Sequence, residues 1–385
     1  MTTIDIFRQS AALHVLAESL EIPLSYYEKA EQRYRSLGEW LERDGSTLAT
    51  LSPVVYAQGS FRYGTVIRCE DGFDLDLVCE LRDLAKNDQS QKVVKEMVGV
   101  EVASYAEAHS MSSEPKPTRR CWHLDYADDV HFHIDILPAI PECDAVEVAP
   151  SSEVDDPNGL AALARFAIAI TDEQHPGYGE CCREWPMSNP KGFGMWFEGR
   201  MRTAADRLLK ARALRVEDIP SYGWKTPLQV AIQILKQHRN TMFSNDRELM
   251  PISMIITTLA AQAYEGELDL REALLGIVTR MPGLINTSSP RIPNPVNLGE
   301  DFADKWAEKP ELENAFWDWH STLRRDLEYL AHNLGASELQ RHFEKRFGFT
   351  LSRERIGELV PVAAVSVIPV ARVTIRTEPW GDSGQ

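Results

Sequence analysis

The chain has 385 residues, of which 43% are hydrophobic and 26% are charged, and its formal net charge is −17 at pH 7. This length suffices for a sizeable core in one large domain or in two lobes. The negative charge opposes non-specific binding to nucleic acid and to anionic membranes. No stretch approaches 18 uninterrupted apolar residues, so we expect no membrane span.

The N-terminus and the cysteines favour a cytoplasmic protein with reduced thiols. Residues 1–20 are interrupted by Asp5, Arg8 and Glu18, and they lack the basic start and the apolar run of a signal peptide. None of the six cysteines forms a C-x-x-C pair, which argues against a structural zinc knuckle.

The first part of the chain predicts helices followed by strands. Residues 4–44 have helical spacing, with Pro23 where a second helix can begin. The segments 54–57, 66–68 and 73–81 are short apolar or alternating runs, as in strands. Residues 90–110 predict a helix, and 131–140 predict a further strand that ends at Pro138.

The second part is predicted to be mostly helical. Residues 141–160 are acidic and rich in turn formers, so we expect a connecting loop, and 291–299 predict a proline-punctuated loop. Four segments carry helical spacing: 194–215, 226–243, 251–266 and 312–334. The expected fold class is therefore α+β with two lobes. We place the sheet lobe with its N-terminal helices at 1–180, the helical lobe at 181–376 and a disordered tail at 377–385.

Two aspartates stand inside the predicted strand "GFDLDLVCEL". Asp74 and Asp76 are two residues apart, so both carboxylates share one face while Leu75 and Leu77 point into the core. Two like charges about 4 Å apart repel by roughly 4 kcal/mol at an effective dielectric near 20. A solvated polar face is one interpretation of this pattern. The other is a divalent cation that neutralises the pair, as Mg²⁺ does in phosphoryl-transfer sites.

Two further features favour the metal interpretation. The turn "QGS" at residues 58–60 can bring backbone N–H groups and a hydroxyl close to a phosphate. Asp135 in "HIDIL" can supply a third carboxylate from an adjacent strand, and two ions bridged by such groups can serve an in-line displacement. His131 and His133 share a face with Asp135, so a metal triad is possible, although hydrogen-bonded groups lining the sheet fit better.

These motifs resemble those of a known superfamily. The Gly59-Ser60 pair, Asp74-Leu75-Asp76 and Asp135 resemble the signature of the polymerase-β-type nucleotidyltransferases. The segments "QGSFRYGT", "DLDLVCEL", "HIDILPAI", "SNPKGFGMWF", "AIQILKQHRN", "PISMIITTLAA" and "IPNPVNLGEDFADKW" are similar to the bacterial CD-NTases, relatives of cyclic GMP–AMP synthase that serve anti-phage (CBASS) systems. The resemblance covers roughly residues 50–310.

The resemblance implies roles for individual residues. Asp74, Asp76 and Asp135 would be catalytic and would bind two Mg²⁺ ions, for which Mn²⁺ can substitute. Five residues would bind the nucleotide, namely Gln58, Gly59, Ser60, Lys236 and Ser253. Lysine suits phosphate as a point charge. On helical periodicity alone, Lys236 would instead be a solvated residue.

The resemblance also implies an activity. We expect a Mg²⁺-dependent synthase that makes a cyclic di- or trinucleotide, such as cyclic GMP–AMP, from ATP and/or GTP held in a cleft between the lobes. The product would activate an effector, a CBASS regulatory protein is a possible partner, and neither DNA nor a membrane is required. Two alternatives stay open: a nucleotidyltransferase that modifies RNA, protein or a small molecule, and a non-catalytic nucleotidyltransferase-like scaffold.

Overall fold

The structure, a computed structural model, describes residues 2–67, 72–126, 132–142, 160–213, 225–332 and 334–359. The chain divides into two compact units. One contains Ile22–Glu198 and Pro293–Glu300, and the other contains Met1–Glu21, Gly199–Ile292 and Asp301–Gln385. This division differs from a single boundary at residue 180, because the first helix groups with helices from the second half of the chain.

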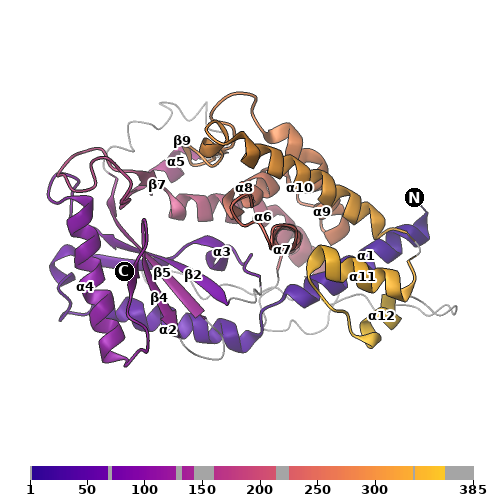
Figure 1. The fold of residues 1–385 in the computed structure, drawn as a ribbon, viewed down its shortest axis with the longest axis horizontal. Coiled ribbons are helices and arrows are strands. Elements are labelled where there is room, and N and C mark those ends of the chain that lie inside the picture. Colours follow the sequence, from indigo (N-terminus) through magenta and orange to yellow (C-terminus); the bar gives the residue numbers. More distant parts are fainter. Residues whose placement is uncertain are drawn as a thin grey trace. The chain divides into compact units, whose positions relative to one another are not determined.

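The first unit contains a mixed sheet. Its strands are β1 (Pro53–Ala57), β2 (Phe73–Leu81), β3 (Lys116–Pro117), β4 (Trp122–Tyr126), β5 (Phe132–Pro141), β6 (Ile168–Ile170) and β7 (Met187–Ser188). The strand order is β1-β2-β5-β4-β3, with β6 paired to β5 and β7 paired to β6. The pair β2–β5 is parallel, whereas β1–β2 and β4–β5 are antiparallel. Figure 1 shows β2, β5 and β4 next to one another. The predicted α+β class is confirmed.

The helix α4 (Gln91–Ala108) packs on one face of this sheet. The unit also contains α2 (Leu24–Glu42), α3 (Gly59–Arg62), α5 (Leu160–Ala164) and the start of α6 (Pro190–Ala213). Trp122 of β4 packs so closely on α4 that a Cβ added to Gly99 would lie 2.2 Å from its ring. The Trp122 indole N–H also donates to the Lys95 carbonyl at 2.8 Å. The sheet face that carries Trp122 is therefore the face that packs on α4.

The strand β5 runs through Pro138, so the prediction that it ends there was wrong. The Pro138 carbonyl accepts a hydrogen bond from the Thr171 N–H at 3.3 Å. Because the N and C=O of one strand residue point to the same side, the missing N–H of Pro138 falls on the side away from β2. On that side β4 pairs up to Ile136 and β6 pairs from Ala139 onward. The proline occupies the gap between these two partners.

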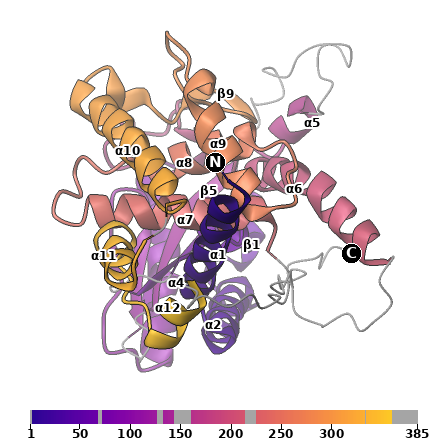
Figure 2. The ribbon, with the colours of Figure 1, turned by 90° about the vertical axis from the view of Figure 1, so that its right-hand side faces the viewer.

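The second unit is helical. It contains α1 (Thr3–Leu20), α7 (Pro227–Met242), α8 (Ser253–Ala263), α9 (Leu270–Arg280), α10 (Pro310–Tyr329), α11 (Ala336–Phe347) and α12 (Arg353–Leu359). Figure 2 shows α1 among helices from the second half of the chain, and α1 contacts α7 and α9. Gln9 of α1 is fully buried, donates to the Leu327 carbonyl at 2.6 Å and accepts from Arg271 at 2.6 Å. These bonds join α1 to α10 and α9.

The remaining predictions had mixed outcomes. The helices predicted at 4–44, 90–110, 194–215, 226–243, 251–266 and 312–334 are present, with bounds that differ by a few residues. Val66 and Ile67 are buried but belong to no strand, so the strand predicted at 66–68 was wrong in its described part. A short hairpin of β8 (Pro293–Asn294) and β9 (Asn297–Asp301) begins in the predicted loop 291–299 and extends two residues beyond it. Most of the loop 141–160 and the whole tail 377–385 lie outside the described residues.

No helix among the described residues combines the length and the apolar character needed to cross a membrane.

Candidate active site

Six polar side chains form two rows across one face of the sheet. In the first row, Asp76 of β2 is the register partner of Asp135 of β5, which is the partner of His123 of β4. In the second row, Asp74, His133 and Asp125 follow one another in the same way. Because residues two apart on a strand point to the same side, both rows share a face. The pattern expected from the sequence, with Asp135 beside the Asp74–Asp76 pair, is therefore present as geometry.

The opposite face of the same strands is apolar. Leu75 and Leu77 of β2, Leu124 of β4, and Ile134 and Ile136 of β5 are all fully buried. On the polar face, Asp74 is exposed, Asp76 is partly buried, and the Asp135 side chain is 33% exposed. The strands are therefore anchored by alternate residues, and they present carboxylates at positions that solvent can reach.

The turn before β2 packs directly on the Asp76 carboxylate. Gly59 has a φ of +66°, and a Cβ added there would lie 2.2 Å from Asp76 Oδ2. Only glycine tolerates both the left-handed backbone and this approach. The Gln58 N–H donates to the Asp76 carbonyl at 2.8 Å, so that backbone group is already used. The predicted turn is the start of the short helix α3, which contains Gly59 and Ser60.

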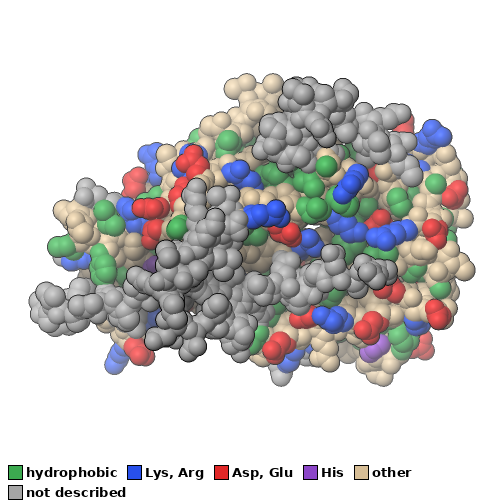
Figure 3. Space-filling view, turned by 180° about the vertical axis from the view of Figure 1, so that it is seen from behind, with side chains coloured by type: hydrophobic (Ala, Val, Ile, Leu, Met, Phe, Trp, Pro, Cys, Tyr) green, Lys and Arg blue, Asp and Glu red, His purple; other side chains and the backbone are tan. Residues whose placement is uncertain are grey.

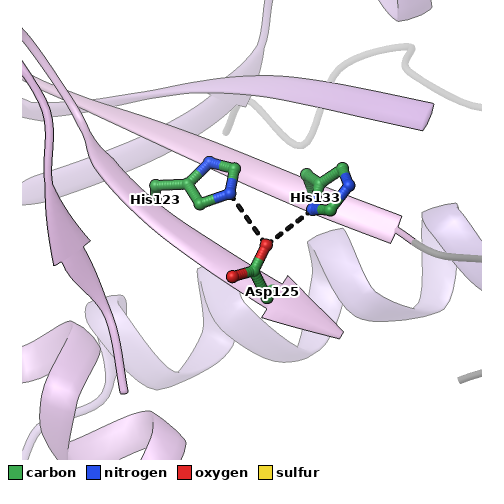
Figure 4. A group of neighbouring side chains, drawn as sticks. All are labelled: His123, Asp125 and His133. Carbon is green, nitrogen blue, oxygen red and sulfur yellow. Dashed lines mark hydrogen bonds and ion pairs between the residues drawn. The ribbon is translucent and has the colours of Figure 1, made fainter. Parts of the chain in front are cut away.

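The two histidines on this face are hydrogen-bonded to carboxylates, as the preferred interpretation predicted for His133. Figure 4 shows His123 and His133 both directed at Asp125, with His123 Nε2 2.8 Å and His133 Nδ1 2.7 Å from Asp125 Oδ1. His123 Nδ1 lies 2.7 Å from Asp135 Oδ1. His131, the third member of the triad considered from the sequence, lies outside the described residues.

These bonds determine the charges on this part of the face. Burial opposes ionisation of Asp125, but the hydrogen bonds from His133 and His123 outweigh it and lower the pKa of the carboxyl group. Burial also disfavours the charged ring of His123, but the bonds and charges of Asp135 and Asp125 outweigh it and raise the pKa of His123. The hydrogen bonds thus favour the charged forms of both Asp125 and His123 on this sheet face.

Sequence reasoning missed His123 and Asp125, although a signal was present. Three strand segments each carry two acidic or histidine residues two positions apart between apolar neighbours: "DLD" at 74–76, "HLD" at 123–125 and "HID" at 133–135. The repeated spacing indicates three neighbouring strands with one chemically active face.

The two donor sets on this face suit different metals. Asp74, Asp76 and Asp135 offer only carboxylate oxygens, which Mg²⁺ prefers, so the residues fit the expected ion. Among the described residues, His123, Asp125 and His133 also place one ligand atom each within 4.8 Å of one another. Two nitrogens and one oxygen suit Zn²⁺ or another transition metal better than Mg²⁺.

Lys236 and Ser253 belong to the helical unit. Lys236 on α7 is only 4% exposed, so the alternative that it is a solvated surface residue was wrong. Ser253 is the first residue of α8, and its hydroxyl accepts a hydrogen bond from Arg239 Nη1 at 3.0 Å. Arg239 is 5% exposed and also donates to the Pro251 carbonyl at 2.9 Å, so it fixes the entry to α8.

Comparisons with known proteins agree with this geometry. Residues 53–138 match the family described as "Cyclic GMP-AMP synthase DncV-like, nucleotidyltransferase domain". The c-di-GMP synthase of Roseivirga ehrenbergii is 30% identical over 333 residues, which is 84% of this chain and 80% of that protein. The cyclic dinucleotide synthase CdnG of Bradyrhizobium diazoefficiens is 26% identical over 345 residues, 83% of this chain and 75% of that protein.

A solved structure shows the same fold. The Bradyrhizobium diazoefficiens CD-NTase CdnG in complex with GTP superposes with a TM-score of 0.64 at 22% identity, covering 91% of this chain and 98% of that chain. The matched nucleotidyltransferase domain includes β2, β4 and most of β5, which carry the polar rows. With a relative 30% identical over most of both chains, the chain belongs to the CD-NTase family of nucleotidyltransferases.

Proposed function

We propose that this chain is a Mg²⁺-dependent synthase that joins two nucleotides, GTP among them, into a cyclic dinucleotide. The observation that carries the proposal is the register of β2 and β5, which brings Asp74, Asp76 and Asp135 to one accessible face beside the Gly59 turn. The names of the two relatives support a cyclic dinucleotide, and the GTP complex of CdnG supports GTP as a substrate.

The reaction needs two phosphoryl transfers. An acceptor hydroxyl attacks the α-phosphorus of the donor, a new P–O bond forms, the bond to pyrophosphate breaks, and the hydroxyl proton is released. A second attack within the linear product closes the ring, so two nucleoside triphosphates give one cyclic dinucleotide and two pyrophosphates.

The residues of this chain would position the reacting groups. Asp74 and Asp76 would hold both ions, and Asp135 would complete the ligand set on the acceptor side. Mg²⁺, when bound, supplies charge neutralisation at the phosphates and activation of the acceptor hydroxyl, and Mn²⁺ can substitute. With the ligands on strands anchored by a buried apolar face, the carboxylates are preorganised for this task.

Five residues would hold the donor triphosphate. Gly59 and Ser60 would offer backbone N–H groups and a hydroxyl. Gln58 would contribute its side chain, since its backbone N–H already bonds Asp76. Lys236 would contribute a charge-assisted contact. Ser253 would donate its O–H to a phosphate oxygen while its oxygen accepts from Arg239.

The physiological role would follow from family membership. The product would activate an effector in anti-phage defence, and a regulatory protein would control the enzyme. Duplex DNA should not be required, because the chain has a net charge of −17. On the face in Figure 3, basic side chains lie among acidic and hydrophobic ones. Nuclease-treated enzyme should give the same rate with and without long duplex DNA at low salt. A tenfold stimulation that fades with added salt would contradict this expectation.

The experiment that tests the activity is mass spectrometry of products formed from the four nucleoside triphosphates, singly and in pairs, with Mg²⁺ or Mn²⁺. We expect a phosphatase-resistant cyclic dinucleotide that contains guanine and forms without any other acceptor. A product that appears only when RNA, protein or a small acceptor is added would overturn the proposal.

A further inference from the structure

His123 is bound at both ring nitrogens on the polar sheet face. Nδ1 is hydrogen-bonded to Asp135 and Nε2 to Asp125, at 2.7 and 2.8 Å. Carboxylate oxygens accept hydrogen bonds, so the ring donates from Nδ1 to Asp135. The ring therefore has one orientation between two strands, with its Nδ1–H directed at Asp135.

The ring is held in turn by a second layer of contacts. Asp125 Oδ1 also accepts from His133 Nδ1 at 2.7 Å, and Lys116 Nζ lies 3.6 Å from Asp125 Oδ2. The two imidazole rings stack, with centroids 5.2 Å apart and planes 25° apart. A chain of hydrogen bonds thus runs from His133 through Asp125 and His123 to Asp135, and each link restricts the rotamer of the next.

The side chains that form these hydrogen bonds are not needed to fill the hydrophobic core. The side chains of His123, Asp125 and His133 are 26–28% exposed, whereas the core of these strands is formed by the residues of the opposite face. The histidine uses Oδ1 of Asp135, and a carboxylate has about four acceptor positions, so the group keeps capacity for another ligand.

We propose that His123 is a positioning residue for Asp135, which it holds beside Asp76 through its Nδ1–H, while Asp125 and His133 fix the ring. The inference rests on the proposed function, in which Asp135 is a ligand on the acceptor side. Without the bond, Asp135 samples other rotamers, and an error of about 1 Å at a reacting centre can cost about 100-fold in rate.

The competing interpretation is a transition-metal site made by His123, Asp125 and His133. In the observed arrangement, the nitrogens that would bind the metal are the ones bonded to Asp125, so a metal would have to break both hydrogen bonds. The two interpretations predict different results for the same variants.

The experiment compares three substitutions of His123. The Asn side chain places an N–H donor near the position of Nδ1, the Gln side chain places one near Nε2, and Ala has neither. We expect His123→Ala and His123→Gln to lower kcat by about 10- to 100-fold and to weaken Mn²⁺ binding about tenfold. His123→Asn should stay within about threefold of wild type in both, and the KM for GTP should change little in all three.

Mn²⁺ affinity is measured by electron paramagnetic resonance, melting temperatures verify folding, and His332→Asn, an exposed histidine of the other unit, is the control. Wild-type rates and Mn²⁺ affinities in all three variants would overturn the inference, as would His123→Asn being as impaired as His123→Ala. A visible Co²⁺ absorption in wild type that His123→Ala abolishes would overturn it in favour of the transition-metal site. A wild type that binds Mn²⁺ but makes no product would refute the proposed function alone, and Mn²⁺ affinities would still decide the role of His123.

Discussion

The two faces of β2, β5 and β4 come from the same strands but carry opposite kinds of residue. On one face, leucine and isoleucine side chains are fully buried against the helical layer, and each such burial stabilises the fold by about 1.5–3 kcal/mol. On the other face, four aspartates and two histidines stand at neighbouring register positions. The first face gives stability, and the second carries a repulsion among carboxylates that the bonded histidines and Lys116 offset in part. Without a function, the repulsion on this face would only lower the stability of the fold.

We expect the largest effect on activity from removing negative charge on the polar face. Replacing Asp74 and Asp76 together by Asn should lower product formation by more than about 1,000-fold, because the proposed function makes them the ligands of both metal ions. The melting temperature without Mg²⁺ should stay the same or rise, since the repulsion is removed. Asp318→Asn, at an exposed helix position, is the control. Full activity in the double variant would show that this face is not the catalytic centre.

A methyl group added at Gly59 tests whether the close contact between the turn and Asp76 is needed for activity. Gly59→Ala places a Cβ 2.2 Å from Asp76 Oδ2 and strains a backbone with φ of +66°, so Asp76 must move. We expect activity to fall about 100-fold, as for a displacement of about 1 Å. Gly179→Ala, where an added Cβ meets nothing within 4 Å, is the matched control. Equal rates in the two variants would mean that the position of Asp76 is not critical.

The apolar face should respond in the opposite way. Leu81 is fully buried on that face at the far end of β2. Leu81→Ala should lower the free energy of unfolding by about 2–5 kcal/mol and leave the activity of the folded enzyme near wild type. Leu298→Ala, at a side chain that is 67% exposed, is the control for denaturant unfolding. A large loss of activity at full stability would contradict the separation of the two faces.

The helical unit contains a buried charged side chain, Lys236, whose role can be tested in the same way. Lys236→Met keeps most of the side-chain length and removes the charge. It should weaken GTP binding by about 1.5–3 kcal/mol and guanosine binding by much less. Calorimetry with both ligands measures the difference, with Lys305→Met at an exposed position as control. An equal loss for both ligands would mean that Lys236 supports the helix rather than the triphosphate.

The sequence was sufficient to predict the strand β2, its two faces and the main helices, because their periodicity is long and regular. It did not yield β4, because the repeated spacing at 123–125 was not recognised and the partner of this strand is set only by long-range pairing. The strand predicted at Val66 and Ile67 was wrong, because these apolar residues are buried without pairing with another strand. The prediction that β5 ends at Pro138 was wrong, because the gap between β4 and β6 that accepts the proline depends on the strand register.

Part of the candidate site could likewise be predicted from the sequence, and part could not. Asp74, Asp76 and Asp135 could be predicted as neighbours because short-range alternation and one parallel pairing suffice. The bond between His123 and Asp135 could not, since it requires the antiparallel register of a third strand. Lys236 was misjudged in one respect, because helical periodicity does not reveal a helix that is buried on nearly all sides.

The most direct test of the polar face as the metal and nucleotide site is a crystal structure with Mn²⁺ and a non-reactive GTP analogue, with anomalous scattering used to locate the ions. We expect peaks within about 2.0–2.6 Å of carboxylate oxygens of Asp74 and Asp76, with Asp135 completing one ion's ligands and His123 still bonded to it. Peaks confined to the His123–Asp125–His133 group, or none on this sheet face while the analogue is bound elsewhere, would contradict the account.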